Sequence, residues 1–358
     1  MRVYRTGLRT RFRGITVRDG VLLRLGDRWA EFSPFPEYDD AYALRWLYAA
    51  VSALAEPLPC PVRDSIPVNV TVPAVDAEQA YAIVQASGGC QTAKVKVAEG
   101  GQSLADDQAR LEAVRAALGG GGAIRVDANT AWSVDEAEKI LPILDRAAAG
   151  GRGRGGLQYA EQPVGSVDDM AALRRRIDVP IAADESIRRS SDPHAVVRLD
   201  AADYAVVKAQ PLGGVRAALN LIEDLALPTV ISSALESSVG IAAGVHLAAC
   251  VPSELTRDAD KRPLACGLAT VHLFDDDVTS TPLLPEQGEL PVRAITPDRL
   301  LAGDAQVCAD AETERWWRQR LERVACLAGD PEAASPYPGL TINEEHVADV
   351  IQAQVRDE

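Results

Sequence analysis

The sequence predicts an α/β protein built as a (β/α) barrel, with an α+β capping domain formed by the N-terminal segment and part of the C-terminal segment. Three observations lead to this fold class. Short apolar or β-branched runs alternate with amphipathic helical segments at intervals of roughly 25–35 residues. Seven such runs and a weaker eighth favour a closed barrel over an open doubly wound sheet. Charged residues stand where several runs end, which is where barrels of this class carry their chemistry.

The expected barrel strands share a stretch rich in Val, Ile, Leu or Ala that is followed by a polar or glycine-rich break. They cover residues 66–72, 93–97, 124–127, 157–161, 180–184, 203–208 and 228–232, with the weaker eighth run at 264–268. Three serines between the runs precede an acidic residue at capping-box spacing: Ser133 with Glu136, and more weakly Ser103 with Asp106 and Ser166 with Asp169. Pro142 conflicts with an unbroken helix, so we expect a kink or an early helix end there.

These patterns divide the chain into three parts. Residues 1–62 are strand-rich and then helical over 40–54, which predicts the N-terminal part of the capping domain. Residues 63–283 are predicted to form the catalytic barrel. Residues 284–358 are predicted to return to the cap, and the Pro-, Glu- and Asp-rich tail from about residue 329 is expected to be partly mobile.

The composition narrows the class of protein. The formal net charge is −15, whereas nucleic-acid binding normally requires a basic face. The six cysteines lie far apart without a C-x-x-C pair, which is typical of reduced thiols in a cytosolic protein. No run approaches the roughly 18 apolar residues of a membrane span. We therefore expect a cytoplasmic enzyme with a small-molecule substrate and with no nucleic-acid or membrane partner, and the oligomeric state stays open.

Three carboxylates end consecutive predicted strands: Asp127, Glu161 and Asp184. Any one of them alone is equally well a helix cap or a surface residue. Three side by side at one barrel mouth would repel each other, and a bound divalent cation relieves that repulsion. An all-oxygen ligand set favours Mg²⁺, with Mn²⁺ as the alternative, over zinc.

Lysines flank this acidic set on both sides. Residues two apart on a strand face the same way, so Lys94 and Lys96 are expected to point together into the barrel, with Lys208 across from them. A lysine close to a second ammonium and a dication has its charged form disfavoured and can act as a general base. The alternative, solvated lysines on an exposed edge strand, fits poorly with the valines around them. The pattern predicts removal of a proton next to a carboxylate, with the resulting enediolate stabilised by positive charge.

The motifs at these positions resemble the enolase superfamily, in its muconate-lactonizing subgroup. The residues that carry the resemblance are Lys94-Val-Lys96, Asp127-Ala-Asn129, Glu161-Gln-Pro163, Asp184-Glu-Ser186 and Lys208. The resemblance covers about residues 1–325 and implies a barrel of the enolase type. Residues 92–99, 182–188 and 265–268, with the early stretch 11–15, are similar to the actinobacterial type of o-succinylbenzoate synthase.

That resemblance implies syn-dehydration of 2-succinyl-6-hydroxy-2,4-cyclohexadiene-1-carboxylate, a dicarboxylate, to 2-succinylbenzoate in menaquinone biosynthesis. It implies that Lys96 abstracts the α-proton and then protonates the departing hydroxyl, while Lys208 stabilises the enediolate. It further implies that Asp127, Glu161 and Asp184 hold Mg²⁺. The substrate-binding positions it implies are Lys94, Asn129, Ser232 and Gly267, the last two at the succinyl arm. Gln210 departs from the family pattern and is expected to alter the pocket floor near Lys208.

Two other functions remain open at this point. N-succinylamino acid racemase and dipeptide epimerase use the same lysine pair and metal ligands, so the chemistry residues do not separate them from the dehydratase. Specificity is expected to lie in the cap loop around residues 8–20 and in the loops after the last strands. A catalytically silent barrel that serves as a binding module should have lost a lysine or a metal ligand, and this chain has all five.

Overall fold

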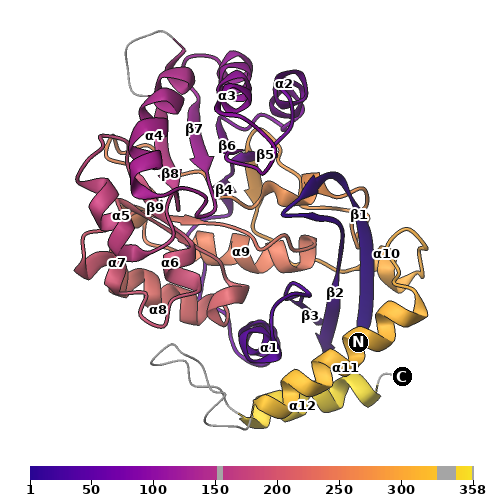
Figure 1. Ribbon diagram of the computed structural model, residues 1–358. Helices are drawn as coiled ribbons and strands as arrows, with labels where there is room; N and C mark the ends of the chain where they lie inside the picture. Colours follow the sequence, from indigo (N-terminus) through magenta and orange to yellow (C-terminus); the bar gives the residue numbers. More distant parts are fainter. Residues whose placement is uncertain (151–155, 329–343, 357–358) are drawn as a thin grey trace.

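In the computed structural model, which describes residues 1–150, 156–328 and 344–356, helices wrap a parallel sheet and a separate cap lies against one side of it (Figure 1). The sheet runs in the order β5-β6-β7-β8-β9-β10-β11, so each strand lies beside its neighbour in sequence. Its strands are β5 (Val70–Val72), β6 (Thr92–Lys96), β7 (Ala123–Asp127), β8 (Leu157–Glu161), β9 (Ile181–Ala183), β10 (Tyr204–Val207) and β11 (Thr229–Ile231). The predicted (β/α) barrel with a capping domain is confirmed.

The weak eighth run closes the barrel. Parallel bridges join Val68 to Cys266 on one side and Ser232 to Gly267 on the other. The Gly267 amide donates to the Ile231 carbonyl at 2.7 Å, so this segment continues the ladder beyond β11. The first predicted run, 66–72, was wrong as a single strand. Its start is β4 (Ser65–Pro67), which pairs antiparallel with β12 (Glu289–Pro291).

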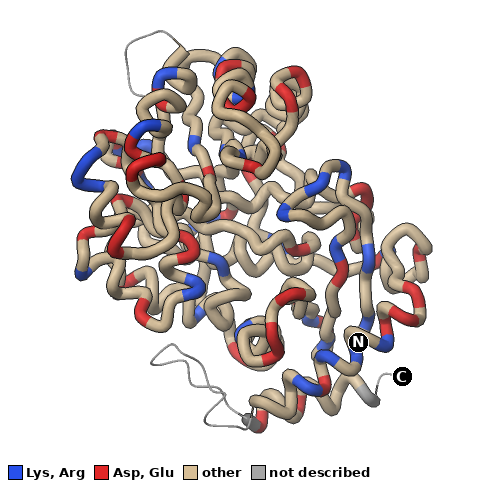
Figure 2. The backbone as a smooth tube through the Cα atoms, viewed as in Figure 1, with Lys and Arg blue, Asp and Glu red and all other residues tan. Residues whose placement is uncertain are grey.

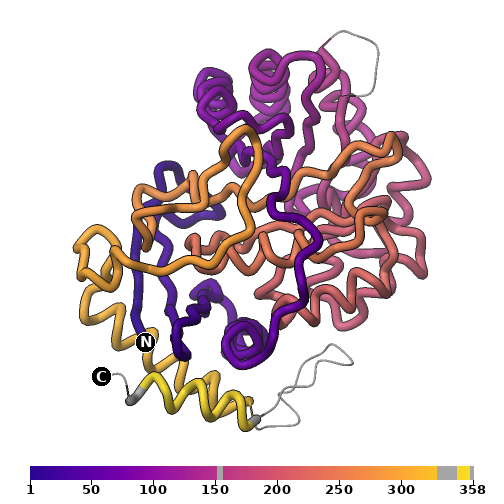
Figure 3. Tube along the Cα trace, turned by 180° about the vertical axis from the view of Figure 1, so that it is seen from behind, coloured from indigo at the N-terminus to yellow at the C-terminus, as the bar shows by residue number. Residues whose placement is uncertain are grey.

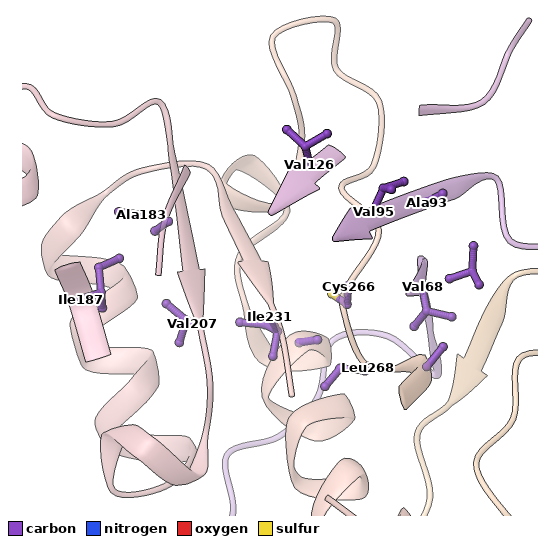
Figure 4. Close-up of a cluster of buried hydrophobic side chains, with 14 of the residues drawn as sticks. Val68, Ala93, Val95, Val126, Ala183, Ile187, Val207, Ile231, Cys266 and Leu268 are labelled. Carbon is purple, nitrogen blue, oxygen red and sulfur yellow. The ribbon is translucent and has the colours of Figure 1, made fainter. Parts of the chain in front are cut away.

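The strands separate an outer apolar layer from an interior that holds charged side chains together with a smaller apolar cluster. Ala93 and Val95 of β6, Val126 of β7 and Val207 of β10 belong to the buried apolar cluster, which Figure 4 shows around the strands. Because side chains alternate along a strand, the residues between them face the interior.

Helices cover the outside of the barrel. They are α2 (Ala77–Gln85), α3 (Leu104–Leu118), α4 (Val134–Ala149), α5 (Val167–Arg174), α6 (Glu185–Arg188), α7 (Ala195–Arg198), α8 (Val215–Leu225) and α9 (Ser238–Cys250), with the 3-10 helices η1 (Gln210–Leu212), η2 (Ser253–Thr256) and η3 (Ala269–Leu273).

The helix start signals hold. Of the kink or early helix end expected at Pro142, the early end was wrong. Ser133 with Glu136 and Ser103 with Asp106 form complete capping boxes, and the Ser166 side chain accepts from the Asp169 amide. Helix α4 runs through Pro142 to Ala149. A proline removes one backbone hydrogen bond from a helix, and in α4 the capping box and the buried Leu141 and Leu144 outweigh that loss.

The cap combines both ends of the chain. Its sheet has the order β1 (Arg2–Phe12), β2 (Ile15–Leu25) and β3 (Arg28–Phe32), followed by α1 (Asp40–Ala55). The later helices α10 (Asp298–Leu301), α11 (Ala311–Leu327) and α12 (Glu344–Arg356) complete the helices of the described chain. Trp46 of α1, Trp317 of α11 and Val350 of α12 share one buried apolar cluster. Figure 3 shows the C-terminal helices beside the indigo N-terminal strands.

The expectation of a partly mobile tail did not foresee α12. This helix packs against α1 and β2. Its Gln354 side chain accepts from the Arg24 amide at 3.1 Å and donates to the Arg24 carbonyl at 2.8 Å. Residues 329–343, to which the same expectation applied, lie outside the described residues.

A buried carboxylate joins the cap to the barrel. Glu31 of β3 accepts hydrogen bonds from the backbone amides of Ser237 and Gly240, both at 3.1 Å. These amides belong to the first turn of α9, where backbone donors lack partners within the helix. The Arg18 guanidinium of β2 donates to the Leu235 carbonyl at 2.8 Å. The cap thereby holds the loop between β11 and α9 from two sides.

The charged residues are mixed along the molecule. Figure 2 shows Lys and Arg interspersed with Asp and Glu in barrel and cap alike. Among the helices that the structure describes, none combines the length and the apolar character needed to cross a membrane.

Candidate active site

The end of β6 places two lysines inside the barrel. Lys94 and Lys96 alternate with Ala93 and Val95, whose side chains pack toward the helices. The two ammonium groups therefore share the inner face of one strand, as the spacing predicts. Lys94 is 8% exposed, which is rare for a lysine without a carboxylate partner.

Three carboxylates follow on the next strands. Asp127 on β7 stands directly opposite Glu161 on β8, and Asp184 comes one residue after β9. All three are at most 1% exposed. The regular step from strand to strand brings them to the same end of the barrel, next to the lysines of β6.

Lys94 and Lys96 meet at the first carboxylate. The Lys94 ammonium lies 2.8 Å from Asp127 Oδ2 and 2.9 Å from Glu161 Oε1, so it bridges two ligand candidates. The Lys96 ammonium lies 2.6 Å from Asp127 Oδ2 and also donates to the Asn129 side chain. Five of the predicted site residues thus form one connected group.

Lys208 approaches from the other side of the acidic row. It follows β10, and its Nζ donates to Asp184 Oδ2 at 2.6 Å. The second oxygen, Asp184 Oδ1, accepts from Arg188 Nε at 2.9 Å. Arg188 also pairs with Glu185 at 2.5 Å. The site therefore has lysines at both ends and carboxylates between them.

The pKa values of the two β6 lysines move in opposite directions. Burial acts to lower the pKa of Lys94, but the Asp127 and Glu161 carboxylates outweigh burial and raise it well above its ordinary value. Burial lowers the pKa of Lys96 despite Asp127, and the Lys94 ammonium adds to that effect. Lys94 is thus held as a permanent cation, and Lys96 is the lysine that gives up its proton more readily.

The pKa values of the carboxylates also move in different directions. Burial acts to raise the pKa of Asp127, but Lys94 and Lys96 hold it well below its ordinary value. Burial, followed by the neighbouring Asp127 charge, raises the pKa of Glu161 to about 7. Glu161 is therefore the member of the row whose charge is least compensated.

The donor set fits a hard divalent cation. All three carboxylates offer oxygen, the ligand type that Mg²⁺ prefers. Glu161 Oε2 is buried and has no hydrogen-bond partner among the described residues, so it remains available to a ligand. Within those residues no three acidic, His or Cys side chains are already gathered as a metal cluster. Lys94 instead bridges Asp127 and Glu161.

The pocket above these residues is shared between barrel and cap. The pocket is lined by Lys94, Lys96, Asp127, Asn129, Asp184, Lys208, Ser232 and Gly267. Glu161 is not among the lining residues, but it contacts one of them, Lys94. The cap contributes Phe12, Arg13 and Phe35. Arg13 lies over the Phe35 ring at 4.5 Å. The cap loop that the sequence singled out around residues 8–20 does reach the pocket, through Phe12 and Arg13.

A second polar layer supports the site from below. Arg125, two residues before Asp127, is fully buried and donates to the Asn69 side chain at 3.0 Å and to the Ala265 carbonyl at 2.7 Å. It crosses the barrel interior and lies over the Tyr159 ring at 4.8 Å. It therefore ties β7 to the segment that carries Gly267.

Sequence reasoning missed Arg188, and it misplaced Gln210. Arg188 stands four residues after Asp184, a spacing at which helix side chains meet, and this was the signal available for it. Gln210 does not line the pocket floor, which corrects the expectation drawn from its sequence position. Gln210 is instead among the residues around a different cavity, between the barrel and the cap.

Comparison with known families agrees with this architecture. Residues 3–54 match the family described as enolase N-terminal domain-like, and residues 76–299 match the one described as enolase C-terminal domain-like. The fold and the site thus define an enolase-like enzyme.

Sequence relatives show to which family of enolase-like proteins the chain belongs. The chain is 52% identical over 320 residues to the o-succinylbenzoate synthase of Thermobifida fusca, covering 89% of this chain and 94% of the relative. It is 47% identical over 321 residues to that of Mycolicibacterium smegmatis, covering 90% and 93%. The chain belongs to the o-succinylbenzoate synthase family of the enolase superfamily. The L-Ala-D/L-Glu epimerase of Bacillus subtilis, with a TM-score of 0.64, 21% identity and coverage of 81% and 94%, shares the fold.

Proposed function

We propose that this chain is a Mg²⁺-dependent o-succinylbenzoate synthase that dehydrates 2-succinyl-6-hydroxy-2,4-cyclohexadiene-1-carboxylate to 2-succinylbenzoate in menaquinone biosynthesis. The observation that carries the chemistry is the placement of Lys96 and Lys208 at opposite ends of the row Asp127, Glu161 and Asp184. The family membership supports the substrate. The absence of a membrane-spanning helix among the described residues and the reduced-thiol pattern support a cytoplasmic setting.

Lys96 is the proposed base. Its neutral form would take the proton from the ring carbon that carries the carboxylate, and burial favours that neutral form. The electron pair left behind delocalises into the carboxylate as an enediolate. Lys96, now protonated, then gives its proton to the departing hydroxyl as the neighbouring C–O bond breaks. Water leaves and the ring becomes aromatic, with no net change in the lysine.

The other residues hold charge in place. Lys208, fixed by Asp184, would face the enediolate as a cation. Asp127, Glu161 and Asp184 would hold Mg²⁺, which supplies positive charge for the substrate carboxylate when bound. Asn129 accepts from Lys96 and would keep its ammonium oriented. Lys94, Ser232 and Gly267 line the pocket and are proposed to contact the substrate.

The test measures two reactions with one protein preparation. With Mg²⁺ and the cyclohexadiene substrate we expect 2-succinylbenzoate to form, and we expect EDTA to abolish its formation. Lys96→Ala should lower kcat by at least about a hundredfold, as expected for loss of a general base. Lys139→Ala, at an exposed lysine of α4, is the matched control.

Racemisation of N-succinyl amino acids is followed in parallel. Racemisation without dehydration would keep the proton-abstracting lysines and overturn the substrate. Full activity in Lys96→Ala would overturn the assignment of the base.

A further inference from the structure

A short helix lies between a proposed metal ligand and the cap. Helix α6 begins directly after Asp184, and the amides of Ile187 and Arg188 both donate to the Asp184 carbonyl at 3.0 Å. Arg188, the last residue of this single turn, is 3% exposed. Its guanidinium extends back along α6 and donates to the Asp184 carboxylate at 2.9 Å and to Glu185 at 2.5 Å. The orientation of the Asp184 carboxylate therefore depends on where Arg188 is held.

The cap holds the backbone of Arg188. Its carbonyl oxygen accepts hydrogen bonds from Arg45 Nη1 at 2.7 Å and from the Tyr42 hydroxyl at 3.1 Å. Both donors belong to α1 of the cap. The last carbonyls of a helix have no partner inside it, and a charged donor forms a stronger hydrogen bond than a neutral one. Arg188 is thus fixed at two points, its guanidinium by carboxylates of the barrel and its carbonyl by the cap.

The two donors on α1 are themselves held in place. Arg45 is 4% exposed, and its guanidinium lies 4.8 Å from the centre of the Tyr42 ring. The Tyr42 ring packs edge-on against Tyr38 at 4.9 Å and Trp46 at 5.4 Å. Burial raises the pKa of Tyr42, so its hydroxyl stays protonated and can donate. This packing prevents the donors from following a displaced Arg188, so they fix its position.

The cap supports one member of the acidic row more directly than the other two. Asp127 and Glu161 pair with lysines of β6, which belongs to the barrel. Asp184 pairs with Lys208 of the barrel through one oxygen and with Arg188 through the other. Because Arg188 is bonded to α1, a change in how the cap packs alters the support of Asp184.

We propose that the cap sets the affinity of the three-carboxylate row for its divalent cation, and that Arg45 and Tyr42 are positioning residues that act through Arg188. The inference rests on the proposed role of these carboxylates as metal ligands. Without the two bonds from the cap, the Arg188 guanidinium no longer holds Asp184 Oδ1 in one orientation, so binding of the cation must also order that carboxylate. Groups that orient a metal ligand contribute to metal affinity in this way. Coupling between two binding events is reciprocal, so a bound cation also strengthens the attachment of α1 to the barrel.

Mn²⁺ is the probe, because the electron paramagnetic resonance signal of the free ion is lost on binding. The titration uses the full-length protein without substrate, so it does not depend on turnover. We expect Arg45→Met to weaken Mn²⁺ binding by about 3–10-fold, the effect of losing one hydrogen bond. Wild-type affinity in Arg45→Met would overturn the proposal. Failure of the wild type to bind Mn²⁺ would instead overturn the ligand set on which the inference rests.

Two further variants accompany this titration. Tyr42→Phe removes one oxygen and keeps the packed ring, so it tests the same relationship if Arg45→Met does not fold. We expect it to weaken Mn²⁺ binding by about threefold, and an unchanged affinity would count against the proposal. Arg216→Met is the matched control, because Arg216 of α8 also donates to a backbone carbonyl, that of Pro57 at 3.0 Å, but at an exposed position after α1. It should leave Mn²⁺ binding unchanged.

A double variant separates positioning from a general loosening of the cap. If Arg45 acts through the Arg188 guanidinium, Arg45→Met should add less than about a twofold further loss of Mn²⁺ affinity to an Arg188→Met protein. An equally large loss in both backgrounds would show that Arg45 affects the site by another route, and would overturn the proposal.

Enzyme kinetics gives a second readout. In Arg45→Met, dehydration should be slower than in the wild type at limiting Mg²⁺ and close to the wild-type rate at saturating Mg²⁺, since the change acts on ion affinity. A loss of kcat that excess Mg²⁺ does not restore would contradict the inference. If the wild type does not catalyse dehydration at all, the proposed reaction is wrong, and the Mn²⁺ titrations still decide the role of Arg45.

Discussion

Arg188 Nε donates to Asp184 Oδ1 at 2.9 Å, while Lys208 occupies the second oxygen of the same carboxylate. Arg188 thus fixes the orientation of a proposed metal ligand without lying among the three. Arg188→Met is expected to lower kcat/KM by about 10–100-fold, the usual effect of removing a group that supports a ligand. Steady-state kinetics over a range of Mg²⁺ concentrations measures this. Arg198→Ala removes an exposed ion pair with Asp192 and is the control. Unchanged kinetics in Arg188→Met would contradict the supporting role.

Lys94→Met should destabilise the metal-free protein. The change leaves Asp127 and Glu161 buried without the ammonium that bridges them, and breaking such a pair costs about 3–5 kcal/mol. Mg²⁺ should restore part of the loss, because it supplies the missing positive charge. Urea unfolding in EDTA and in Mg²⁺ measures both effects, with Lys139→Ala as the control. A Lys94→Met protein as stable in EDTA as the wild type would rule out this account.

Glu236 is expected to make stability depend on pH. Burial, followed by the charge of Glu31, raises the pKa of Glu236 from its ordinary value of 4.5 to about 7 in the folded chain. The folded state therefore holds this proton more tightly than the unfolded state does. Its contribution to stability is present below about pH 4.5 and is lost as the pH rises through about 7.

Glu236→Gln should remove this dependence. Relative to the wild type, the variant is expected to gain on the order of 3 kcal/mol between pH 4.5 and 8. Urea unfolding of both proteins across this range gives the difference. Glu254→Gln, at an exposed position, is the control. A difference that stayed constant with pH would show that Glu236 has an ordinary pKa.

Gln354 should contribute to the stability of the cap. Its carboxamide pairs with both backbone groups of Arg24, beyond the point where β1 begins to pair with β2 at Leu22. Gln354→Ala is expected to lower the free energy of unfolding by about 1–3 kcal/mol, since two partly buried hydrogen bonds to the backbone of Arg24 are lost. Gln352→Ala, exposed on the same helix, is the control. Chemical denaturation measures both, and equal losses would argue against a specific role of Gln354.

The sequence alone predicted those parts of the site whose positions follow from regular strand geometry. Strand alternation places Lys94 and Lys96 on one face, and the strand-to-strand step places Asp127 beside Glu161. Both relations depend on repeat spacing alone. The closing segment with Gly267 was visible only as a weak run, because it joins its neighbours through isolated bridges rather than a full ladder.

Contacts between segments far apart in the sequence could not be predicted from repeat spacing. Helix α12 packs against α1 and β2 through Val347, Val350 and Gln354. No pattern in the sequence of this helix predicts those partners. The place of Gln210 beside the cavity between cap and barrel could not be predicted, because the walls of that cavity come from both parts. The early helix end expected at Pro142 followed from a local rule, and helix α4 continues past it because of its capping box and its buried leucines.

The division of the cap between both ends of the chain has a consequence during synthesis. Phe32 and Trp46 share a buried cluster with Trp317 and Val350, so Phe32, the end of the first strands, leaves the ribosome about 285 residues before Trp317. At 5–20 residues per second this interval lasts roughly 14–57 s. For that time the nascent cap must keep its apolar face exposed or covered by a chaperone. The barrel is translated within the same interval. Its strands can therefore pair before the C-terminal helices that complete the cap have been synthesised.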